Sequence, residues 1–97
     1  MRTIKQFINN EKKVYFYLKD TETCRAFFEK AHEEGLTLGG EDPRTKDTSD
    51  IIALLPHGEL CYVGWAGRMC YHNASSSGAL RIDYDSYAAG NTDYLVK

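Results

Sequence analysis

One segment, residues 20–35, carries helix signals at both of its ends and constrains the fold more than any other part of the chain. Asp20 or Thr21 can cap the first backbone N–H groups, and Gly35 suits the left-handed position that follows a helix. Apolar side chains recur at helical spacing between these ends: Cys24, Phe27, Phe28 and Ala31. Charged residues occupy the other face, so we predict an amphipathic helix at about 21–34.

The other apolar runs are short and rich in β-branched and aromatic residues, which is typical of strands. We predict strands at 14–18, 51–55, 60–65 and 79–83. The turn at 56–58 makes the second and third of these a hairpin. The segments 36–38 and 68–72 are further candidates for the sheet. The predicted fold class is α+β, with one main helix packed on a four- to five-stranded, mostly antiparallel sheet.

With 97 residues, the chain is the size of a single domain, which we assign to 1–97. We interpret residues 1–13 as an N-terminal arm with one or two helical turns. Residues 39–50 form a long polar loop, 84–90 a turn or single helical turn, and 91–97 a C-terminal tail.

The formal net charge of -2 argues against a strongly basic nucleic-acid binder and against a heavily acidic DNA mimic. The charge is nevertheless segregated. Residues 1–19 hold five basic and one acidic side chain, whereas residues 20–50 hold four basic and nine acidic ones. We therefore expect the helix and its following loop to form an acidic surface, with Glu29 and Glu33 as candidate partner-binding residues.

The sequence also predicts a compartment. No apolar run approaches the ~20 residues of a membrane span, and the first ten residues do not read as a signal peptide. The three cysteines are an odd number, which favours a reducing compartment over a disulfide framework. We expect a cytoplasmic protein.

The candidates for catalysis and metal binding are weak. The spacing H-x3-C-x8-C-x-H matches no zinc pattern, so we favour core cysteines and surface histidines at its four positions, which are His57, Cys61, Cys70 and His72. No nucleophile elbow or phosphate-binding loop is present. Asp83 and Asp85 would share a face of a strand, and we favour solvated edge residues over a magnesium or acid–base pair. We expect no catalytic residue, metal or cofactor.

Seven of the twelve aromatic residues are tyrosines. We expect Tyr15, Tyr17 and Tyr62 to be structural. The candidate partner-binding cluster lies further along the chain: Trp65, Arg68, Tyr71, His72, Arg81, Tyr84 and Tyr87. Trp, Tyr and Arg dominate binding hot spots, and the same residues could stack on a nucleotide and pair with its phosphates. The competing interpretation places Trp65 in the core of the sheet, where the tyrosines cover it.

Three segments carry a family resemblance. From Val14 to Gly35 a strand is followed by a helix ending in AHEEG, and later segments read YVGWAGRMCYH (62–72) and RIDYDSYAAGNTDYL (81–95). Together they resemble small uncharacterised proteins encoded by phages and mobile elements of Firmicutes. The resemblance implies an accessory protein that binds and blocks host machinery, and several anti-CRISPR proteins share this size and α+β character. It supplies no functional residues.

The preferred function is a non-enzymatic phage accessory protein that binds and inhibits a host protein, such as a CRISPR-type defence nuclease. We expect no membrane and no direct nucleic-acid partner, and we allow for a homodimer. One alternative is a sponge for a signalling nucleotide, in which Trp65, Arg68 and Arg81 would converge on a pocket. A metal-dependent enzyme is the second alternative.

Overall fold

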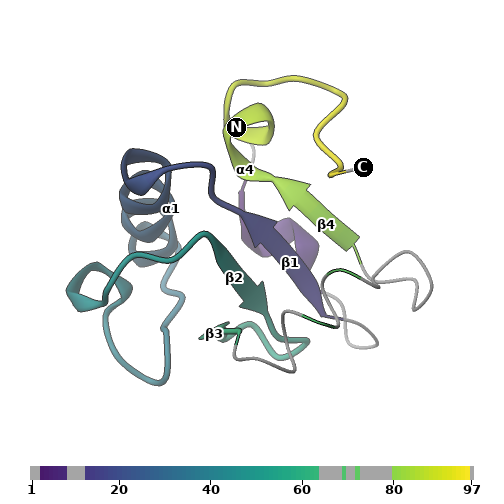
Figure 1. Ribbon diagram of the computed structural model, residues 1–97. Helices are drawn as coiled ribbons and strands as arrows, with labels where there is room; N and C mark the ends of the chain where they lie inside the picture. Colours follow the sequence, from purple (N-terminus) through teal and green to yellow (C-terminus); the bar gives the residue numbers. More distant parts are fainter. Residues whose placement is uncertain (1–2, 9–12, 64–68, 70–71, 73–79, 97) are drawn as a thin grey trace.

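The computed structural model describes residues 3–8, 13–63, 69, 72 and 80–96 of the chain. Figure 1 shows a helix beside a small twisted sheet, with a second, shorter helix at the end of the last strand. The elements run in the order η1 (Lys5–Phe7), β1 (Val14–Tyr17), α1 (Thr21–Glu33), η2 (Pro43–Thr45), β2 (Ile51–Leu54), β3 (Leu60–Tyr62), β4 (Leu80–Asp83) and α4 (Tyr84–Ala88). The predicted α+β class is confirmed.

The sheet has the strand order β3-β2-β1-β4. The β2–β3 pair is antiparallel, as the predicted hairpin requires. The β1–β2 pair is also antiparallel, whereas β1 and β4 are parallel. In the central strand Phe16 lies opposite Ile52 on one side and Ile82 on the other. All three side chains are 0% exposed, so this row forms the centre of the core. The sheet is therefore mixed, but mostly antiparallel.

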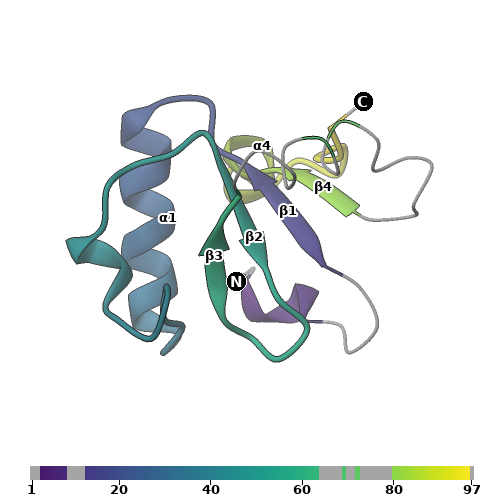
Figure 2. The same cartoon turned by 60° about the horizontal axis from the view of Figure 1, so that its bottom comes forward.

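The helix α1 forms where its local signals predict it. The Asp20 carboxylate accepts a hydrogen bond from the Thr23 N–H at 2.8 Å, which satisfies one free donor of the first turn. Gly35 has a φ of +79°, the left-handed conformation that ends the helix. The four predicted apolar residues are all buried: Cys24, Phe27, Phe28 and Ala31. The helix thus covers one face of the sheet (Figure 2).

The helix α4 corrects the expectation that Tyr84 and Tyr87 belong to an exposed surface. They are 7% and 2% exposed, and both join the main core. Their spacing of i and i+3 places both rings on the same side of a short helix. That side faces the aromatic core, with the Tyr84 ring 5.0 Å from the Phe27 ring and the Tyr87 ring 5.0 Å from the Phe7 ring.

Several shorter segments also differ from expectation. Residues 36–38 make only isolated bridges from Leu38 instead of forming a strand, and the long loop contains the 3-10 turn η2. Met69 and His72 have helical backbone, so these two residues do not continue the sheet. The C-terminal tail pairs with β4, because Leu95 bridges Ile82. These contacts shield both edges of the sheet with irregular backbone.

Candidate functional site

A hollow lies where α1 and α4 meet. Its volume is about 560 Å³. The residues that line it come from the N-terminal segment, α1, and α4 with the two residues that follow it: Ile4, Lys30, Glu33, Tyr84, Tyr87, Ala88, Ala89 and Gly90. Ile4 and the two tyrosines belong to the core, so the apolar wall of this hollow is held by packing on its inner side.

A second hollow adjoins the first. It measures about 340 Å³ and is lined by Glu22, Thr23, Ala26, Tyr84, Asp85 and Ala88. Both hollows are lined by Tyr84 and Ala88, so they adjoin at these two residues, and we call the pair of hollows the α1–α4 groove. The small exposed side chains of Ala26 and Ala88 leave room between the two helices.

The rim of the α1–α4 groove is mainly acidic. Glu22 forms no ion pair with any residue that the structure describes, and Glu33 is paired only with Lys30, at 3.9 Å. Asp85 lies 3.2 Å from the ammonium of Lys19, and both side chains are about half exposed. Exposed pairs of this kind are weak and exchange readily. Carboxylates on both sides of an apolar floor therefore favour a ligand with positive charge next to an apolar group.

The N-terminal segment forms one wall of the groove. The Glu34 carboxylate accepts hydrogen bonds from the backbone N–H of Ile4 at 2.9 Å and of Lys5 at 2.8 Å. The Tyr87 hydroxyl donates to the Thr3 carbonyl at 2.8 Å. These bonds place Ile4 against the tyrosines, so the wall is attached to both α1 and α4.

The Tyr84 hydroxyl remains protonated throughout the ordinary pH range. Burial raises its pKa to about 12, and the negative charges of Glu34 and Glu33 add to the shift. The hydroxyl of Tyr84 is therefore a neutral phenol, next to the carboxylates of the groove.

The structure brings together part of the predicted partner-binding set. Glu33, Tyr84 and Tyr87 border the larger hollow, but the two tyrosines are only 7% and 2% exposed, so little of their surface is open there. Glu29 is exposed on α1 but does not line it, and His72 is exposed elsewhere. Arg81 pairs with Tyr15 in register and so belongs to the opposite face of the sheet. The remaining predicted residues lie outside the described residues: Trp65, Arg68 and Tyr71.

Most residues that line the two hollows are not among the predicted binding residues, including Ile4, Ala26, Lys30 and Ala88. The only local signal is Ala26 on the otherwise charged face of the helix, between Glu22 and Lys30 at spacings of i±4. A small residue in that stripe indicates a place where another element can approach. Ala88 gives no comparable signal, because a helix of five residues is too short to show a periodic pattern of side chains along one face.

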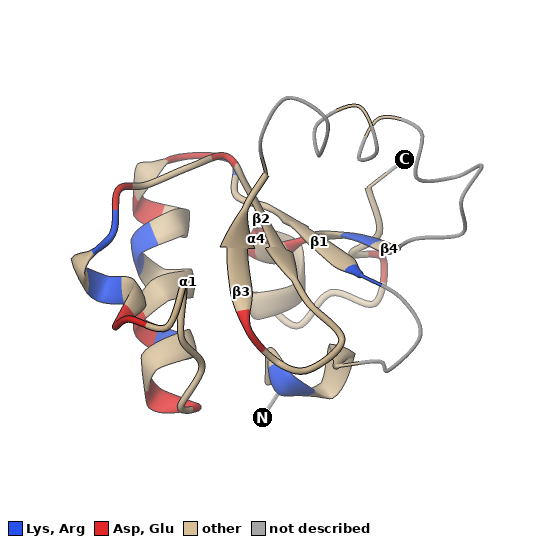
Figure 3. Cartoon of the chain, turned by 90° about the horizontal axis from the view of Figure 1, so that it is seen from below, with Lys and Arg blue, Asp and Glu red and all other residues tan. Residues whose placement is uncertain are grey.

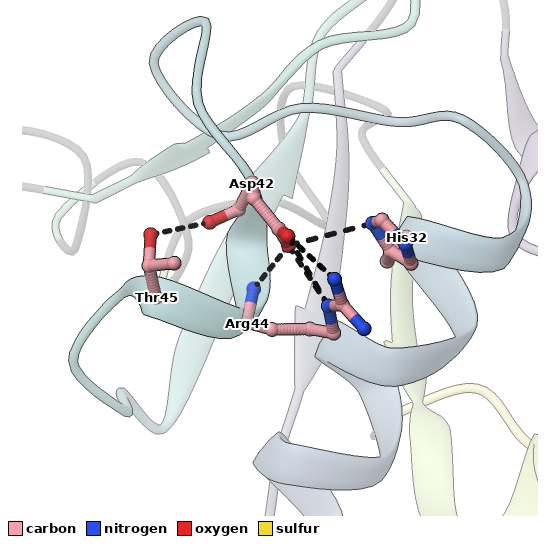
Figure 4. Close-up of polar contacts among 4 residues, drawn as sticks. All are labelled: His32, Asp42, Arg44 and Thr45. Atoms are coloured by element: carbon pink, nitrogen blue, oxygen red, sulfur yellow. Dashed lines mark hydrogen bonds and ion pairs between the residues drawn. The ribbon is translucent and has the colours of Figure 1, made fainter.

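A separate polar cluster fixes the loop after α1 (Figure 4). The Asp42 carboxylate accepts bonds from the Arg44 backbone N–H at 2.9 Å and from the Arg44 Nη2 at 2.8 Å. His32 Nδ1 lies 3.5 Å from the same carboxylate, and the Thr45 hydroxyl donates to the Asp42 carbonyl at 2.7 Å. These contacts cap η2 and connect it to α1, so we assign this cluster a structural role.

Acid should release this loop within a defined pH window. The Arg44 side chain and backbone lower the pKa of Asp42 from 3.8 to about 2. A lowered folded-state pKa contributes stability that is present above pH 3.8 and lost as the pH falls through about 2. We expect the NMR signal of the Arg44 amide to shift with a midpoint near pH 2, and Asp42→Asn to abolish that titration. A midpoint at the ordinary pKa of aspartate would contradict the contact.

The described cysteines and carboxylates show no arrangement for catalysis. Burial raises the pKa of the Cys24 and Cys61 thiols, which disfavours a nucleophilic thiolate. Among the described residues, no three His, Cys, Asp or Glu side chains lie close enough to hold a metal, and Cys70 is outside that set. Asp83 and Asp85 do not share a face of a strand, because β4 ends at Asp83 and Asp85 belongs to α4. Asp85 is exposed, as predicted, whereas Asp83 is partly buried.

In the part of the chain that the structure describes, no helix is long and apolar enough to cross a membrane. Comparison of the chain with protein-family models, with curated proteins and with solved structures gives no match.

Proposed function

We propose that this chain is a non-enzymatic protein-binding factor, which recognises a positively charged surface of a partner through the acidic side of α1. The observation that carries the proposal is the position of Glu22, Glu29 and Glu33. They are exposed and follow one another at i, i+7 and i+11, so they form a single stripe on the helix. At 1.5 Å per residue the stripe is ~16 Å long. Figure 3 shows acidic residues along α1 and in the loop that follows it.

The partner class that suits such a stripe is an enzyme with a basic nucleic-acid channel. Complementary potentials steer association and reject like-charged surfaces. A factor that occupies the channel inhibits the enzyme without any chemistry of its own. We therefore propose inhibition of a host protein, with a CRISPR-type defence nuclease as the favoured target. The family resemblance of the sequence supports the choice of target, and the acidic stripe supports the mode of binding.

The test is affinity capture from host cells with charge-reversed variants. We expect the wild-type chain to retain a basic nucleic-acid-binding protein and to inhibit its nucleic-acid cleavage. The double variant Glu29→Lys/Glu33→Lys should lose both effects. Glu59→Lys, in the turn between β2 and β3, is the matched control and should keep them. Because exposed charges are screened by salt, capture should also weaken as the salt concentration rises.

Two results would overturn this proposal. One is that no basic protein is retained by the wild-type chain. The other is that the charge-reversed variant retains and inhibits the same protein as the wild type does, since the stripe would then contribute nothing to binding.

A further inference from the structure

We propose that the α1–α4 groove binds a short peptide segment, in which one large apolar side chain is flanked by lysine or arginine. This inference deepens the proposed function, because it rests on a protein partner and names the segment of that partner that enters the groove. Binding at the groove requires an apolar side chain in the ligand, whereas binding at the acidic stripe requires only positive charge.

The larger hollow has the size of a binding pocket, and its walls are held in place by packing. A volume of about 560 Å³ lies within the range of pockets that enclose a bound group. Tyr84 is fixed by its edge contact with Phe27 at 5.0 Å, and Tyr87 by its hydrogen bond to Thr3. Two walls are therefore ordered before a ligand arrives, which lowers the entropic cost of binding.

The rim of the groove carries exposed carboxylates. Glu33 has a side chain that is 68% exposed, whereas its partner Lys30 is only 22% exposed. The Lys30 stem therefore packs along the groove, while the Glu33 carboxylate remains open to a ligand. Glu22 carries a second open carboxylate at the other hollow, and Asp85 a third that is half exposed. An anionic ligand would meet these carboxylates, so a nucleic-acid or phosphate ligand is disfavoured.

The shape of the groove and the charge of its rim together define the ligand. The exposed apolar surface of the groove, at Ala26, Ala88 and the Lys30 stem, takes the anchor, and the carboxylates at either hollow take cations on each side of it. Because the hollows adjoin at Tyr84 and Ala88, the anchor and its flanking cations lie within one short segment of chain. A large apolar residue flanked by positive charges satisfies both requirements.

The probe is a displayed library of random short peptides, selected on the purified full chain. We expect the enriched peptides to share one Leu, Met, Phe or Trp with Lys or Arg within a few positions of it. A synthetic peptide with the enriched sequence should lose at least ~10-fold in affinity when the anchor is changed to Ala, which corresponds to the apolar contact.

Matched variants locate the binding site. Ala88→Trp fills the junction of the two hollows and should weaken peptide binding ~10-fold or more, since Ala88 is exposed and the change leaves the core intact. Thr92→Trp adds the same indole at an exposed position outside the groove and should have no effect. Glu33→Gln should weaken binding about threefold, as expected for an exposed charge, and Glu59→Gln should not. Thermal melts check that every variant is folded.

The outcomes separate this inference from the proposed function. Selection of no shared motif, of acidic peptides, or of peptides that bind equally well to Ala88→Trp would overturn the groove as a peptide site. Failure of the affinity capture would overturn the inhibitor proposal while peptide binding stands. Loss of a captured partner in Glu29→Lys/Glu33→Lys but not in Ala88→Trp would show a partner bound by the stripe without the groove, and would overturn the inference alone.

Discussion

Replacing Phe16 by alanine is expected to destabilise the protein by about 3–5 kcal/mol, as for other large-to-small changes in a core. Phe16 is 0% exposed in the central strand. Its ring lies 5.0 Å from that of Phe27, 5.8 Å from that of Phe7 and 6.2 Å from that of Tyr84. Removing it leaves a cavity between the sheet, α1, α4 and η1 at once. Because a domain of this size is marginally stable, the loss approaches its whole stability.

Urea denaturation gives the measurement, with Leu80→Ala as the control. Leu80 lies in the same sheet but is 41% exposed, so its truncation should change the free energy of unfolding by no more than about 0.5 kcal/mol. Phe16→Leu should fall between the two, because it keeps most of the side-chain volume. Equal effects of Phe16→Ala and Leu80→Ala would contradict the position of Phe16 at the centre of the core.

The elements that were predicted correctly are those with local signals. The cap at Asp20, the apolar spacing along α1 and the turn at Gly35 lie within one segment, and no distant residue is needed to read them. The same holds for the hairpin, whose turn residues lie between two short apolar runs. These local signals predict the fold class correctly, and the bounds of the predicted helix and strands differ from the observed ones by only a few residues.

The burial of Tyr84 and Tyr87 had no such signal. A short segment that mixes tyrosines with polar residues is equally typical of an exposed surface, and its burial depends on where β4 places it in the fold. The parallel pairing of β1 with β4 places α4 beside α1, and that pairing joins strands separated by most of the chain. Nonlocal pairing of this kind cannot be read from a spacing rule. The predicted exposed surface therefore failed at these two residues.

The groove could not be predicted for the same reason. Its floor and rim combine Ile4 near the start of the chain, Glu33 in α1 and Ala88 in α4. Glu33 could be predicted, because the charge on a helix face follows from local spacing alone. The alanines could not, because a small residue forms a groove only through what lies opposite it.

Replacing Glu34 by alanine is expected to release the N-terminal segment and to cost about 2 kcal/mol. Its carboxylate accepts two backbone bonds, at 2.9 Å from Ile4 and 2.8 Å from Lys5. Hydrogen bonds to a charged group contribute about 1.5–3 kcal/mol each when buried, and we take the lower part of that range because the contact with Lys5 is exposed. Hydrogen exchange at the Ile4 and Lys5 amides, together with urea denaturation, gives the measurement.

Glu33→Ala is the matched control, because Glu33 is adjacent in the chain but its side chain is 68% exposed. It should change stability by no more than about 0.5 kcal/mol and leave amide exchange at Ile4 unchanged. Comparing peptide binding by these two variants also tests which residues form the groove. Glu33→Ala removes a rim charge and keeps the wall, whereas Glu34→Ala keeps the rim and loosens the wall that carries Ile4. Glu34→Ala could leave both hydrogen exchange at the Ile4 amide and peptide binding unchanged. In that case the N-terminal segment would not be a wall of the groove, and only α1 and α4 would form the pocket.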